Sequence, residues 1–143
     1  MQKPQKPTPQ EMKLYAALAA VVGFAGSVAA VWTLMGFGRT ISHHMSGEVF
    51  VLLATLGAFC AGLAVSPWLG QGGWKGAIVS LVCFFGATIV GAWIAGLLGL
   101  GAQHYDLVGL WLMFNFFTPL AVLWLGLWGA THWMGTVIRR KLT

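Results

Sequence analysis

The chain has 143 residues, of which 58% are hydrophobic and only 8% are charged. An ordinary soluble domain has about 45–50% apolar and about 25% charged residues. A soluble fold of this length and composition would expose apolar patches that aggregate, so a soluble protein is excluded and a membrane protein is indicated. The length fits a single domain. The net charge of +5 does not indicate a nucleic-acid partner, because the basic residues form no groove with stacking side chains.

Four long stretches contain no charged residue at all: 14–38, 49–74, 76–105 and 107–138. Each is longer than the about 20 residues that a helix needs to cross a bilayer core of roughly 30 Å. We therefore predict an all-α integral membrane protein with four transmembrane helices in an antiparallel up-down bundle. The transmembrane domain is expected over 13–138, with helices at about 13–36, 48–69, 76–100 and 107–138 and external loops at 37–47 and 101–106.

The first segment, residues 1–12, holds Pro4, Pro7 and Pro9 among lysine, glutamine and threonine residues. Such a sequence favours extended, solvated conformations, so we predict a Pro-rich cytoplasmic tail. The start of the chain also resembles a secretory signal peptide that ends at Ala29. Because the apolar run continues beyond Ala29, we expect this segment to be retained as the first helix.

The placement of the basic residues predicts the orientation. All of them except Arg39, which falls in the first predicted external loop, lie at the ends of the chain or in the turn after the second helix: Lys3, Lys6, Lys13, Lys75, Arg139, Arg140 and Lys141. Lys and Arg near membrane spans stay on the cytoplasmic side, and four crossings return both termini to one side. We therefore predict a multi-pass protein of the bacterial cytoplasmic membrane. Its N-terminus and its basic C-terminus, 139–143, are expected in the cytoplasm, near anionic headgroups.

Small residues recur every four positions in the third predicted helix, at Ala87, Gly91, Ala95 and Gly99. Small residues at this spacing let two helix backbones approach closely, which is how membrane helices associate. This face is expected to pack inside the bundle or to dock another subunit.

The fourth predicted helix has two different sides. At 100° per residue, Asn115, Thr118 and Val122 fall on one side, and Trp124 and Trp128 on the other. A polar side chain at membrane depth is costly unless it is paired, so the Asn115 side is expected to face the bundle, a partner or a permeation path. The tryptophan side is then expected to face lipid or the flank of a larger complex. Pro119 predicts a kink, because it lacks the amide that would bond to the Asn115 carbonyl.

The predicted external loops contain the histidines His43, His44 and His104, and Met45 follows the first two. Imidazole and thioether groups suit a metal such as copper. No spaced ligand motif accompanies them, so we predict no metal site and keep the three histidines as weak candidates.

No carboxylate lies inside the four charge-free stretches, and no serine or cysteine has a base at a recognisable spacing. Enzymes need a positioned acid, base or nucleophile, so we predict no catalysis and no cofactor, although a bound lipid or pigment would suit the deep tryptophans. We expect a non-catalytic accessory or scaffolding subunit of a larger bacterial membrane complex, such as a respiratory or photosynthetic one. Its partners would be membrane lipids and other membrane subunits. The alternatives are a small oligomeric transporter or channel subunit and an external-face metal-handling protein.

Overall fold

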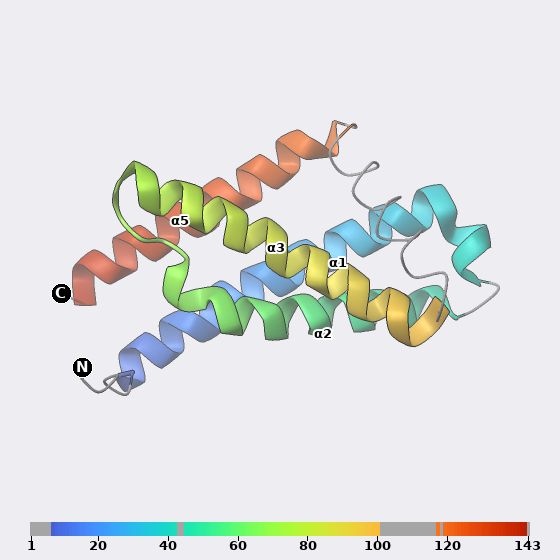
Figure 1. Ribbon diagram of the computed structural model, residues 1–143, viewed down its shortest axis with the longest axis horizontal. Coiled ribbons are helices and arrows are strands. Elements are labelled where there is room, and N and C mark those ends of the chain that lie inside the picture. Colours follow the sequence, from blue (N-terminus) through green and yellow to red (C-terminus); the bar gives the residue numbers. More distant parts are fainter. Residues whose placement is uncertain (1–6, 43–44, 101–116, 118, 143) are drawn as a thin grey trace.

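The computed structural model describes residues 7–42, 45–100, 117 and 119–142. These residues form helices and no strand (Figure 1): α1 Pro9–Ser42, α2 Gly47–Val65, the short 3₁₀ helix η1 Ser66–Trp68, α3 Gly73–Leu100 and α5 Leu120–Leu142. Within this described part of the chain, three segments are long and apolar enough to cross a membrane: Pro9–Gly36, Gly47–Trp68 and Gly73–Leu98. The all-helical class and the membrane character that the composition predicts are therefore confirmed.

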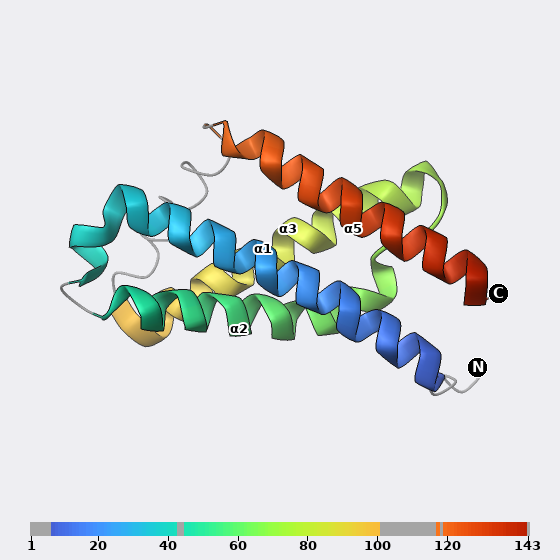
Figure 2. The ribbon, with the colours of Figure 1, turned by 180° about the vertical axis from the view of Figure 1, so that it is seen from behind.

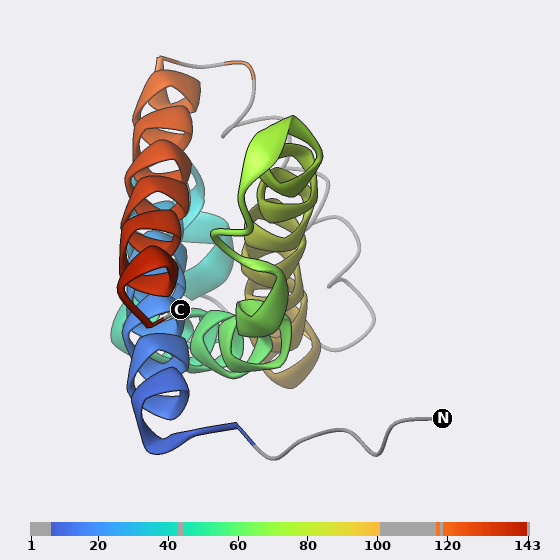
Figure 3. The same ribbon diagram turned by 90° about the vertical axis from the view of Figure 1, so that its left-hand side faces the viewer.

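The helices run up and down, so that α1 starts and α5 ends at the same end of the molecule (Figures 1 and 2). The turn between α2 and α3 lies at this end too, and we call it the terminal end. Among the described residues, α2 packs against both α1 and α3, whereas α5 contacts α1 and α3 but not α2. Figure 3 looks along the bundle from the terminal end and shows α5 lying over α1, with α3 to one side.

The start of α1 differs from the predicted solvated tail over 1–12. Helix α1 begins at Pro9, because Thr8 and Glu11 form a reciprocal cap. The Thr8 backbone N–H and hydroxyl donate to the Glu11 carboxylate at 2.7 and 2.9 Å, and the Glu11 N–H donates back to the Thr8 hydroxyl at 3.3 Å. Proline suits the first helical position, where no amide partner is needed. The helix also runs on to Ser42, through most of the predicted loop at 37–47.

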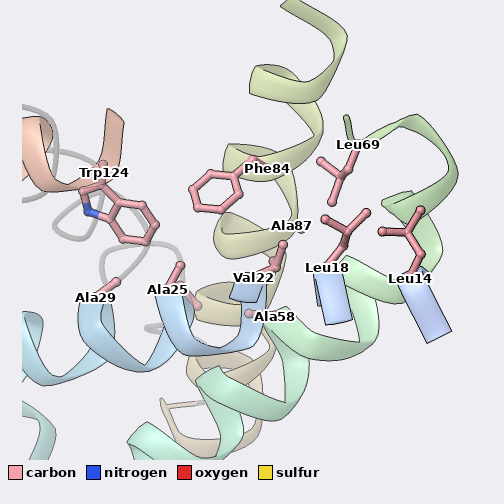
Figure 4. Close-up of a cluster of buried hydrophobic side chains, with 11 residues drawn as sticks. Leu14, Leu18, Val22, Ala25, Ala29, Ala58, Leu69, Phe84, Ala87 and Trp124 are labelled. Atoms are coloured by element: carbon pink, nitrogen blue, oxygen red, sulfur yellow. The ribbon is translucent and has the colours of Figure 1, made fainter. Parts of the chain in front are cut away.

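Close contacts between backbones join the first three helices. A Cβ atom added to Gly26 of α1 would lie 2.6 Å from the Ala58 Cβ of α2. A Cβ added to Gly91 of α3 would lie 2.7 Å from the Ala54 carbonyl oxygen, also in α2. Small residues therefore allow both crossings, as is usual for helices in membranes. Next to these crossings lies a cluster of buried apolar side chains that includes Phe84 and Trp124 (Figure 4).

The predicted fourth helix, 107–138, is described only in its second part. Residues 107–116 and 118 lie outside the described residues, Phe117 lies in a bend and Pro119 in a turn, and α5 begins only at Leu120. Pro119 lies directly before α5, where proline is tolerated, and its carbonyl oxygen accepts a bond from the Val122 N–H at 3.1 Å. The predicted kink at Pro119 also involves the preceding segment, which lies outside the described residues.

Candidate functional site

The predicted small-residue face of α3 is covered by α2. Ala87, Gly91 and Ala95 are buried, and the contact of Gly91 with Ala54 and Ala58 leaves no room for a side chain. In the described residues, this face packs within the chain. The surroundings of Gly99 lie outside the description.

The two faces of α5 are the reverse of the prediction. Trp124 is only 2% exposed. Its ring lies 5.9 Å from that of Phe84 and 6.0 Å from that of Phe85, and Figure 4 shows it pointing toward α1 and α3. Trp128 is partly buried against the same cluster, whereas Val122, on the side expected to face inward, is 74% exposed.

Asn115 and Thr118, whose side was predicted to face inward, lie outside the described residues. The inward face of α5 is instead formed by Trp124, Thr131 and Gly135, at spacings of seven and four residues. These spacings return to one side of a helix.

Polar atoms without a partner lie beside this packing. The Trp128 and His132 rings stack at 6.0 Å. The Trp128 Nε1 and His132 Nδ1 atoms are buried and have no hydrogen bond within the described chain. The Ser80 hydroxyl of α3 is likewise buried and unpaired there. An unsatisfied buried polar atom costs about 1–3 kcal/mol, so these three positions are weak points of the described fold.

The end of α5 is anchored by Arg139, which the sequence analysis treats only as a topology signal. Its Nε donates to the Leu69 carbonyl at 3.1 Å, and its Nη2 donates to the Ser66 and Pro67 carbonyls at 3.0 and 3.1 Å. Its guanidinium group lies 5.7 Å from the centre of the Tyr15 ring. The last carbonyls of a helix lack partners in that helix, and cations are favoured there. Arg139 therefore caps α2 and η1, and Pro67 and Gly70 were the sequence signal that a helix end needed a cap.

A contact between two glycines sits beside this cap. Gly70 has a φ of +69°, and a Cβ added to it would lie 2.5 Å from the Gly135 Cα of α5. The Thr136 hydroxyl lies 3.3 Å from the Gly70 carbonyl and 2.8 Å from the His132 carbonyl. The turn after η1 and the end of α5 thus fit together backbone to backbone.

An apolar groove of about 520 Å³ opens between α3 and α5. Its α3 wall includes Val82, Phe85, Gly86 and Ile89, and its α5 wall is formed by Ala121, Trp124 and Leu125. A Cβ added to Gly86 would meet nothing within 4 Å, so the groove is open above this glycine. Its walls carry no acid, base or nucleophile, so it can bind an apolar group but not transform one.

The predicted metal candidates His43, His44 and His104 lie outside the described residues. Within the part of the chain that is described, no three His, Cys, Asp or Glu residues lie close enough together to hold a metal ion.

Comparisons of the chain with protein-family models, with curated proteins and with solved structures found no match. Evidence about its function therefore comes from its own residues.

Proposed function

We propose that the chain is a non-catalytic accessory subunit that packs against a larger complex in the bacterial cytoplasmic membrane. In this proposal, α5 and the segment before it complete a fourth crossing, so that both termini are cytoplasmic. The terminal end is the basic end of the described chain, since it carries Lys13, Lys75 and Arg140. Exposed Trp74 and Trp133 supply the indole rings that favour the headgroup level.

The observation that carries the proposed role is an apolar face along α2. Val49, Leu52, Leu56, Cys60 and Leu63 are all exposed, and their spacing places them on one side of the helix. The opposite side of α2 is filled by α1 and α3. A continuous face of this kind suits the side of another transmembrane helix, where aliphatic side chains pack without a polar partner.

Cys60 allows a direct test, because it is exposed on this face. A Cys83→Ala variant leaves Cys60 as the only cysteine of the chain, and a photo-crosslinker attached to it samples the neighbours of α2 in native membranes. We expect one defined protein adduct, identified by mass spectrometry, which also migrates with the chain in mild detergent. The matched control carries Cys60→Ala, Cys83→Ala and Phe24→Cys. It labels an exposed position of α1, where lipid adducts should predominate.

Two outcomes would contradict the accessory role. Cys60 could give lipid adducts only, with the chain migrating alone in mild detergent. Alternatively, the purified chain could carry a solute flux in liposomes, which would favour the transporter or channel alternative.

A further inference from the structure

The face of α3 that lines the groove carries a positive charge nearer the terminal end. Lys75, Ile78, Val82, Gly86 and Ile89 follow each other at spacings of three or four residues on α3, so they share one face of the helix. Val82, Gly86 and Ile89 line the groove. Lys75 therefore lies at the terminal end of the same face, one turn before the exposed Ile78.

The positive charge of Lys75 has no acidic partner among the described residues. Its Nζ lies 5.9 Å from the centre of the exposed Trp74 ring. Of the described carboxylates, Glu11 is bonded to Thr8, and Glu48 starts α2 at the opposite end of the molecule. The backbone amides in the first turn of α3 add partial positive charge at the same place. This end of the groove thus suits an anion.

The depth and size of the groove suit an acyl chain below that anion. At 1.5 Å per residue, Val82 lies about 10 Å and Ile89 about 21 Å along α3 from Lys75. Half of a bilayer, headgroup region included, is about 20–22 Å thick, so these positions lie at depths from the acyl region to about the midplane of one leaflet. A cavity of about 150 Å³ holds benzene. By that measure, the 520 Å³ of the groove accommodates a chain of about 20 carbons.

We propose that this groove binds one acyl chain of an anionic phospholipid and that Lys75 binds the phosphate of the same molecule. The acyl chain crosses α3 in the open space above Gly86, and Leu125 and Ala121 of α5 form the other wall of the groove. A transmembrane helix or a second copy of this chain would fill the apolar groove without supplying the anion. The proposal does not depend on the accessory role, because it concerns a different face from the exposed side of α2.

The test uses the full-length chain, purified in mild detergent, delipidated and titrated with phosphatidylglycerol or phosphatidylcholine of identical acyl chains. Bound lipid is counted by native mass spectrometry. We expect tighter binding of phosphatidylglycerol. Lys75→Gln should reduce this preference about fivefold, the effect of one basic side chain near a membrane surface. Because Lys75 is exposed, this variant should fold normally.

Gly86→Leu places a branched side chain in the groove at a position where an added Cβ meets nothing within 4 Å. It should lower the affinity for both lipids by more than about tenfold, since every displaced methylene contributes to acyl binding. Gly126→Leu is the matched control, because Gly126 is exposed, has nothing within 4 Å of an added Cβ and does not line the groove. Equal binding of the two lipids by the natural chain would overturn the proposal. So would unchanged binding by Gly86→Leu, or a Gly86→Leu variant that loses a dimer or a partner protein but keeps its lipid.

Discussion

Arg139 satisfies three carbonyl oxygens of the Ser66–Leu69 segment with one side chain. Its guanidinium group is planar and carries five donors in a fixed geometry, which an ammonium group does not provide. The partly buried site also reduces competition from water. A residue that marks orientation from sequence alone thus has a second, structural role at the terminal end.

Replacing Arg139 should destabilise the fold. Arg139→Met keeps the aliphatic stem but removes one donor from each of the three carbonyls. The Ser66 and Pro67 carbonyls keep the Leu69 N–H and the Gln71 side chain as donors, so we expect a loss of about 1–3 kcal/mol from the bonds that Arg139 made. Arg139→Lys should recover only part of this, because it has no planar fork. Reversible unfolding in mixed micelles, followed by tryptophan fluorescence, measures the change. Lys141→Met removes a neighbouring exposed cation and should change stability much less. Equal losses in Lys141→Met and Arg139→Met would rule out the capping role.

Gly70 is the second residue on which the terminal end depends. Gly70→Ala would place a methyl group against the Gly135 backbone and would also strain a backbone at φ +69°. Strained positions of this kind cost about 1–3 kcal/mol, so a clear drop in the thermal unfolding midpoint is expected. The control is Gly72→Ala, where an added Cβ meets nothing within 4 Å. If both variants melt together with the natural chain, the Gly70–Gly135 contact is not a stabilising one.

At the scale of elements, α5 depends on its tryptophans for attachment. Trp124 packs against two phenylalanine rings of α3, and Trp128 adds a partly buried ring one turn later. Helix α5 also packs along α1, so the rings, this packing and the Arg139 cap together hold α5 in the bundle.

Trp124→Ala should therefore loosen α5 from the bundle. Truncating a buried tryptophan costs about 3–5 kcal/mol, because a cavity replaces the ring. Trp133→Ala removes the same side chain from the same helix, but at a position that is 69% exposed, and should cost far less. Chemical unfolding of the two variants in one detergent provides the comparison. A larger loss in Trp133→Ala would favour the orientation first predicted, with Trp124 toward lipid.

At the scale of the whole molecule, the charge-free stretches predict the helical class and three candidate spans well, because the absence of charge over about 20 residues is a strong physical requirement of the bilayer core. The ends of helices are predicted less well. The Thr8–Glu11 cap could have been found from its spacing, whereas the continuation of α1 through Gly38 and Arg39 has no comparable local signal.

The candidate site likewise has features that could be predicted from the sequence and features that could not. The close packing at Gly91 follows from the small-residue spacing, since only small residues permit it. The inward turn of Trp124 could not be predicted from α5 alone, because a tryptophan suits lipid and protein equally well. It required knowledge of where the helix begins and of the rings on α3. The groove likewise arises from the relative placement of α3 and α5.

The distance in sequence between Arg139 and the carbonyls that it caps has a consequence for how the protein is assembled. These partners are 70 to 73 residues apart, so the α2–α3 hairpin is synthesised long before its cap. Until α5 is made, the turn supplies only local donors to two of these carbonyls, the Leu69 N–H to Ser66 and the Gln71 side chain to Pro67. Water must supply the donors that Arg139 later provides. Docking of α5 is thus the step that completes the hydrogen bonding at this end of the hairpin.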